Sequence, residues 1–178
     1  ILNKQLEILF FNTDFNEKDY SELKSLLFGI KRADVLSENK DLFFMKAYFI
    51  LKTLSASVLS VEDIKDFIDL DNAFLELKNI QLPNYRDLED NKKKCEDLLF
   101  KLLESRRFDN ERKGHLVKLL TDENRKGKDN CSKRTVLIVV HKKYLQLSIE
   151  SYLEKLKYKN LSISVETYGK IKNKNYYD

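Results

Sequence analysis

The chain is 178 residues long, which allows one or two domains with a buried core. Hydrophobic residues make up 42% and charged residues 35%, a composition typical of a soluble, folded protein that carries more charge than average. A helical membrane span is excluded, because no run of the sequence approaches the roughly 18 consecutive apolar residues that a span needs. The net charge of +4 permits a phosphate-binding surface without requiring one.

Residues 1–120 are predicted to form a helical bundle or insertion, because apolar residues recur there at helical spacing. The expected helices cover residues 4–11, 16–28, 41–56, 61–70, 87–108 and 110–120. Gly29 predicts the end of the second of these helices, and Ser60 with Asp63 predicts an N-cap followed by an acidic first turn. Residues 41–56 are the most apolar and are expected to form the central core helix.

Residues 121–134 (TDENRKGKDNCSKR) mark a change of architecture and are predicted to be a polar linker. They are charged, contain Gly127 and precede a switch from helical to strand spacing. Residues 135–140 (TVLIVV) are an apolar, β-branched run, 145–156 an amphipathic helix and 161–167 a second strand. The pattern predicts a β-α-β unit with parallel strands, so the expected fold class is α/β with a mostly helical N-terminal region.

The first predicted strand is apolar on both faces, and such strands lie inside parallel sheets that are covered on both sides. A parallel sheet of only two strands is not stable alone. Residues 135–178 are therefore expected to be an incomplete domain. We expect the rest of a longer polypeptide, or a second copy of the chain, to complete it.

No complete catalytic or cofactor motif is present in the sequence. It holds neither a GxxxxGK[ST] phosphate loop nor GxGxxG, and neither HExxH nor a Cys/His cluster with metal-ligand spacing. No catalytic residue, metal site or cofactor is therefore predicted for this chain, and a small enzyme with an unrecognised site is one alternative. Cys95 and Cys131 lack CxxC spacing, which favours the reduced thiols of a cytoplasmic protein.

The candidate binding residues His141, Lys142 and Lys143 directly follow the first predicted strand. Ligands of open α/β sheets bind at the carboxyl ends of the strands, and the free amides that begin the next helix favour anions. Three hydrogen-bond donors at this position suit a phosphate, and the alternative is an ordinary solvated loop. Residues 168–178 combine three Tyr with three Lys, and such a combination contacts single-stranded nucleic acid by stacking and phosphate neutralisation.

Four segments carry a likeness to a known family: residues 51–70 (LKTLSASVLSVEDIKDFIDL), 113–120 (KGHLVKLL), 132–156 (SKRTVLIVVHKKYLQLSIESYLEKL) and 163–170 (ISVETYGK). Together they resemble the second RecA-like lobe of superfamily-two helicases, including Swi/Snf-type remodellers. The resemblance implies that residues 135–178 are an incomplete RecA-like (Rossmann-type) helicase lobe. The parent protein would then use ATP and Mg²⁺ to move along nucleic acid.

Under this resemblance His141, Lys142 and Lys143 would contact the nucleic-acid backbone, and Gly169 and Lys170 would line the neighbouring loop. The ATP-binding motifs of the family would lie before residue 1 and after residue 178, so this chain alone is expected to be inactive. The alternative is a helical protein–protein interaction module without catalytic activity, whose strands a partner completes. A nucleic-acid binder should lose affinity steeply with salt, whereas an interaction module should change its oligomeric state with concentration.

Overall fold

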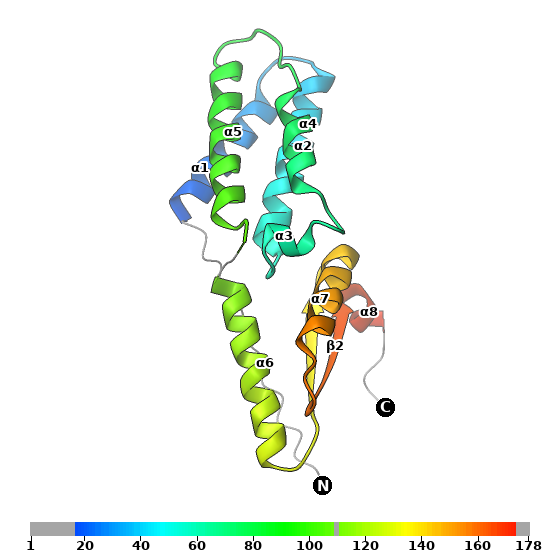
Figure 1. The fold of residues 1–178 in the computed structure, drawn as a ribbon. Coiled ribbons are helices and arrows are strands. Elements are labelled where there is room, and N and C mark those ends of the chain that lie inside the picture. The colour runs from blue at the N-terminus through cyan, green and yellow to red at the C-terminus, as the bar shows by residue number, and fades with distance from the viewer. Residues whose placement is uncertain (1–16, 109–110, 174–178) are drawn as a thin grey trace.

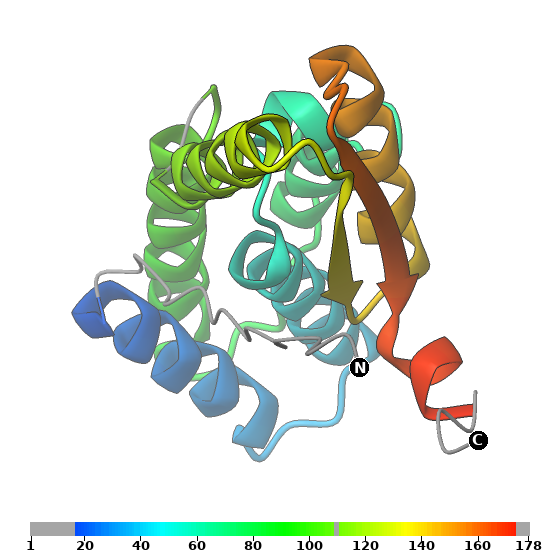
Figure 2. The same cartoon turned by 90° about the horizontal axis from the view of Figure 1, so that it is seen from below.

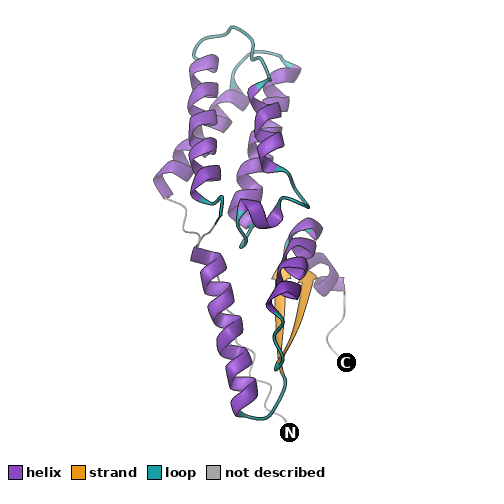
Figure 3. Cartoon of the chain, viewed as in Figure 1, coloured by secondary structure: helices purple, strands orange, loops and turns teal. Residues whose placement is uncertain are grey.

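The computed structural model describes residues 17–108 and 111–173, which form an elongated molecule with a helical bundle at one end and a small sheet at the other (Figure 1). The bundle comprises α1 (Glu17–Arg32), α2 (Glu38–Ala56), α3 (Val61–Ile64), α4 (Leu70–Lys78) and α5 (Leu88–Ser105). The remainder comprises α6 (Glu111–Asp129), β1 (Arg134–Val140), α7 (Lys143–Leu156), β2 (Leu161–Thr167) and α8 (Tyr168–Asn173). Helices dominate and two strands pair in one sheet, which confirms the mostly helical α/β class (Figure 3). The helix expected over residues 4–11 lies outside the described residues.

The bundle is stabilised by apolar side chains that its long helices bury against one another. Helix α2 contacts α1, α4 and α5, which confirms it as the central helix of the bundle. Leu27 of α1, Phe43 and Ile50 of α2, and Leu99 of α5 are fully buried. Burying one such side chain contributes about 1.5–3 kcal/mol to stability.

The end predicted for the first bundle helix at Gly29 is wrong. Helix α1 continues through Ile30, because the side chain of Ile30 is fully buried in the core and no described glycine has a left-handed φ angle. The chain leaves the helix just beyond, where Lys40 Nζ donates to the carbonyl oxygens of Ala33 and Val35 at 2.9 and 2.8 Å. A buried lysine therefore satisfies two carbonyl groups of the segment that connects α1 to α2.

The N-cap predicted at Ser60 is confirmed as a capping box. The Ser60 hydroxyl accepts a hydrogen bond from the Asp63 amide, and the Asp63 carboxylate accepts one from the Ser60 amide at 3.2 Å. The helix that begins there ends at Ile64, earlier than expected. A second helix, α4, starts afresh because the Asp69 carboxylate caps it by accepting from the Asn72 amide at 2.9 Å.

Two buried arginines donate hydrogen bonds to the carbonyl groups where α2 ends. Arg106 ends α5 and donates to the carbonyl oxygens of Leu54 and Ser57, where α2 ends. Arg112, in the first turn of α6, donates to the Ser55 carbonyl at 2.7 Å and also reaches Ser57. The C-terminus of α2 carries partial negative charge, which favours these two cationic side chains beside it.

The polar linker expected over residues 121–134 is mostly helix. Helix α6 runs to Asp129 and β1 begins at Arg134, so the connection shrinks to residues 130–133. The composition of this segment is polar because the C-terminal half of α6 buries only a narrow face, which includes Leu120 and Gly127. Its other residues are exposed to solvent or half-buried, and composition alone does not distinguish such a helix surface from a loop.

The β-α-β unit has the predicted topology. Strands β1 and β2 pair in parallel, with Val136 opposite Ile163 and Ile138 opposite Val165. Helices α6 and α7 both contact these strands, and Figure 2 shows the two strands side by side with α7 alongside them. The residues on this face are buried or half-buried.

The other face of the sheet differs from the expectation that both would be covered. Leu137 and Val139 of β1 are each 48% exposed. Both strands are edge strands within the described residues, since the sheet has only two.

The bundle and the sheet share one core across the division expected near residue 120. Ile149 of α7 and Val165 of β2 belong to the same cluster of buried residues as the bundle side chains. A second, smaller cluster is formed by Leu116 and Leu120 of α6 with Leu161 of β2. The two parts are therefore packed as one body, although their secondary structure changes at α6.

Candidate nucleic-acid interface

The structure brings the predicted binding residues together at the carboxyl edge of the sheet. Val140 and Thr167 are opposite each other at the ends of the parallel strands. The residues that follow, His141 after β1 and Tyr168 after β2, are therefore neighbours, and their ring centroids lie 6.2 Å apart with an interplanar angle of 47°. Two exposed flat rings at one edge can support stacking against a base.

Positive charge and free amides coincide beside these rings. Lys142 is the N-cap residue of α7, with an extended backbone and no side-chain cap hydrogen bond, and Lys143 is the first helical residue. Both lysines are exposed. The first turn of α7 contains no acidic residue, so the positive end of the helix dipole is not offset from within the helix. An external anion such as a phosphate would be stabilised there.

Gly169 and Lys170 lie at the same edge but not in a loop. They belong to the short helix α8, which begins directly after β2. Lys170 Nζ pairs with Glu166 Oε2 at 2.9 Å, so its charge is partly offset before any ligand binds. No heavy atom lies within 4 Å of a Cβ built at Gly169, so packing does not require glycine at this position.

Two residues that sequence reasoning missed position this edge. The Tyr144 hydroxyl lies 3.2 Å from Thr53 Oγ1, which ties the start of α7 to α2 in the bundle. The buried Gln146 side chain donates to the Val165 carbonyl and to Glu150 Oε1, both at 2.8 Å. These bonds fix the first turn of α7 against β2. The one signal for Gln146 in the sequence is a glutamine on the apolar side of an amphipathic helix. Nothing in the sequence indicates the role of Tyr144.

A groove of about 550 Å³ runs beside the outer edge of β2 and does not extend the interface. Its lining includes the carboxylates of Glu150, Glu154 and Glu166, the side chains of Lys157 and Lys170 at its two ends, and the apolar side chains of Leu161 and Val165. The carboxylates outnumber the lysines, and this surplus of negative charge disfavours a phosphate inside the groove. The candidate interface is therefore limited to the strand ends, where Glu166 is paired with a lysine.

The described residues also bear on metal binding and on the state of the two thiols. No group of three or more His, Cys, Asp or Glu side chains that could hold a metal occurs among the described residues. Cys95 is buried, and this burial raises the pKa of its thiol to about 12. Within the same residues, no helix has the length and apolar character needed to cross a bilayer.

Comparison with known proteins does not place the chain in a family. No protein-family model, no curated protein and no solved structure matches it.

Proposed function

We propose that this chain binds the backbone of single-stranded nucleic acid at the carboxyl edge of its sheet, as a fragment of an ATP-dependent helicase or translocase. The observation that carries the proposal is the register of β1 and β2, which brings His141 and its two following lysines beside Tyr168. Lys142 and Lys143 would neutralise phosphates with the amides of α7, while His141 and Tyr168 would stack on a base.

The proposal assigns the nucleotide chemistry to the parent protein. ATP and Mg²⁺ would bind to segments outside this chain, and residues 135–178 would supply part of a RecA-like lobe. The parallel β-α-β unit supports this fold, because such lobes are built from parallel strands with crossover helices. Two unpaired cysteines support a cytoplasmic location.

The test is the affinity of the full chain for a fluorescent oligodeoxythymidine, measured by anisotropy over a range of salt. The double variant Lys142→Glu and Lys143→Glu should weaken binding by about tenfold or more at low salt and flatten its salt dependence. A matched variant, Lys93→Glu with Lys94→Glu, reverses the same charge on exposed residues of α5 and should bind like the unaltered chain. Equal loss in both variants would reduce the effect to net charge and overturn the proposal.

A second candidate function is a protein–protein interaction module without catalytic activity. The exposed Leu137 and Val139, on a sheet with two unpaired edges in the described part of the chain, favour it. This function predicts a concentration-dependent change in oligomeric state, measured by light scattering, and affinity for oligodeoxythymidine that Lys142→Glu and Lys143→Glu leave unchanged.

A further inference from the structure

A second basic surface lies at the opposite end of the strands from the candidate interface. We name Lys128, Lys133, Lys157 and Lys159 the basic end; all four are exposed. None of them forms an ion pair with another described residue. They surround the start of the sheet, where Arg134 is opposite Leu161.

The local charge exceeds that of the whole molecule. Residues 125–134 and 157–160 contain seven Lys or Arg against one acidic residue, Asp129, a surplus of six compared with +4 for the chain. Glu123 pairs with two of the seven at 2.6 and 2.5 Å, and Asp122 pairs with a third at 3.3 Å. The other four of the seven, which are the lysines of the basic end, are not offset by these carboxylates.

Tight backbone contacts hold the three segments of the basic end together. A Cβ on Gly127 would lie 2.6 Å from the Asn160 carbonyl oxygen and 3.0 Å from that of Ser132, so glycine allows α6 to touch both turns. The Ser132 amide donates to the Gly127 carbonyl at 3.0 Å, and the Arg134 amide donates to the Asn160 carbonyl at 3.1 Å. The Asn160 amide is in turn held by Asn124 Oδ1 at 2.9 Å. The lysines therefore project from a fixed frame.

Lys157 has a backbone conformation that glycine adopts with less strain than other residues do. It is the C-cap residue of α7, with φ 49° and ψ 51°, in the left-handed region. Glycine usually ends helices in this conformation, because a side chain is strained there. The side chain at this position is an exposed ammonium group at the start of the turn that leads into β2.

We propose that the basic end is a second phosphate-binding surface for nucleic acid, so that one bound strand runs from the carboxyl edge to the basic end across the exposed face of the sheet that carries Leu137 and Val139, outside the acidic groove beside β2. The choice of partner rests on the proposed function. The seven residues of β1 span about 20 Å, which an extended oligonucleotide can cover. A membrane is a poorer partner, because no large hydrophobic side chain is exposed among the described residues 125–134 and 157–160.

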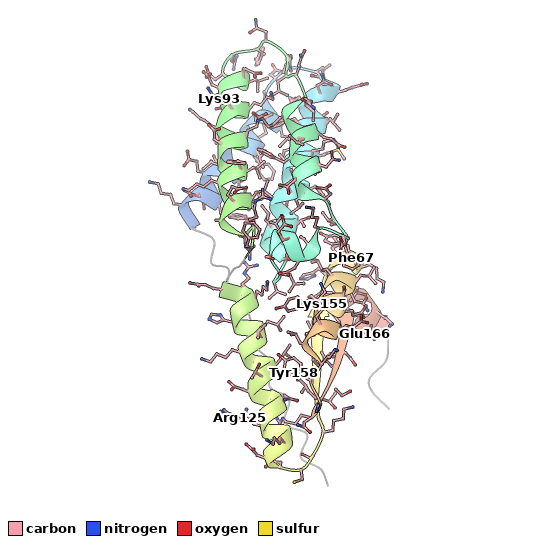
Figure 4. All side chains as sticks on the ribbon, in the orientation of Figure 1. Phe67, Lys93, Arg125, Lys155, Tyr158 and Glu166 are labelled. Carbon is pink, nitrogen blue, oxygen red and sulfur yellow. The ribbon has the colours of Figure 1, made fainter. Side chains whose placement is uncertain are left out.

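The first test uses a fluorescent oligodeoxythymidine of about 20 nucleotides, longer than a typical single-strand site of about 4–16. Lys157→Glu with Lys159→Glu should weaken its affinity by about tenfold and lower the salt slope by roughly 0.7 for each lost phosphate contact. Lys93→Glu with Lys94→Glu is the matched control, since Figure 4 places Lys93 at the far end of the molecule from Arg125. Equal binding of polyglutamate by the unaltered chain would assign the surface to something other than nucleic acid.

Lys157→Gly separates binding from folding. The substitution relieves the left-handed backbone, so the melting temperature should stay level or rise while affinity for the oligodeoxythymidine falls. A lysine with only a structural role would give a lower melting temperature and unchanged affinity, and that result would overturn the inference.

Cys131 reports directly on the basic end, because it is exposed between Lys128 and Lys133 while Cys95 is buried. A photo-cross-linker attached to Cys131 should join to the oligodeoxythymidine, and unlabelled oligonucleotide should compete. No cross-link, with affinity lost only in Lys142→Glu and Lys143→Glu, would sink this inference and leave the proposed function intact. Affinity lost only in the Lys157 and Lys159 variant would reject binding at the carboxyl edge, and with it the path between the two surfaces. No loss of affinity in either variant would reject both proposals.

Discussion

The two thiols of the chain differ sharply in their surroundings. Cys95 is fully buried in α5, and desolvation followed by the nearby Glu96 charge raises its thiol pKa to about 12. Cys131 is exposed at the end of α6. Because the thiolate is the reactive form, an aromatic disulfide reagent should titrate one thiol in the folded chain and two after denaturation. Cys131→Ser should leave no reactive thiol before unfolding, and rapid modification of both cysteines in the folded chain would contradict this.

The Asp63 carboxyl links the capping box to α6. Burial alone would raise its pKa, but hydrogen bonds from Lys113 and Ser60 and the charge of Lys113 outweigh that effect, and the pKa is lowered. Lys113 Nζ lies 2.8 Å from Asp63 Oδ2.

A lowered pKa in the folded state means that ionised Asp63 stabilises the fold above its unfolded value of about 3.9, and that this contribution is lost as the pH falls further. Asp63→Asn should therefore cost about 1 kcal/mol of unfolding free energy at pH 7 and progressively less below pH 4. Urea titrations at a series of pH values measure the difference, and a constant difference across the series would refute the assignment.

At the scale of the element, α6 contains two glycines with opposite roles. Gly127 is buried against Asn160, and a Cβ there would meet a carbonyl oxygen at 2.6 Å. Gly114 is exposed, with nothing within 4 Å of a Cβ at its position. Gly114→Ala should stabilise the chain by up to about 1 kcal/mol through helix propensity. Gly127→Ala should instead destabilise it by about 1–3 kcal/mol, because α6 must move away from the sheet. Thermal unfolding of both variants checks the signs, and stabilisation by both would contradict the close approach.

The sequence predicts some of these elements well and others poorly, for identifiable reasons. β-branched runs and a helical period that alternate over short distances predict the strands and α7. The sequence does not predict where α1 and α6 end, because tertiary burial sets the C-terminus of each helix: Ile30 is buried in the bundle, and Gly127 lies against Asn160. Local residue preferences carry no information about such contacts.

The candidate site shows the same limit. Topology alone places His141 and Gly169 at one sheet edge, since parallel strands end together. The contact of Tyr144 with Thr53 joins residues 91 positions apart, and no pattern in the sequence predicts it. The sequence also does not predict the short helix α8, whose first turn brings Lys170 back to pair with Glu166 of β2.

At the scale of the whole molecule, the sheet depends on the bundle for stability. Two parallel strands bury too little apolar surface to fold alone, yet Val165 lies in the same core as the bundle residues. Leu153 of α7 packs against both apolar clusters and so connects α6, the sheet and the bundle. Unfolding should therefore be a single cooperative transition, rather than separate melting of the bundle and the sheet.

Leu153→Ala tests this coupling. It should lower the unfolding free energy by about 2 kcal/mol and shift the transition seen by circular dichroism together with the exchange of the β1 and β2 amides, because both report one event. Leu147→Ala removes a side chain from the exposed face of the same helix and should change stability by less than about 0.5 kcal/mol. If Leu153→Ala accelerated the exchange of the strand amides without changing the unfolding free energy of the bundle, the sheet would be an independent unit. Its stability would then have to come from a partner that completes it, which would favour the interaction module over a self-supporting nucleic-acid binder.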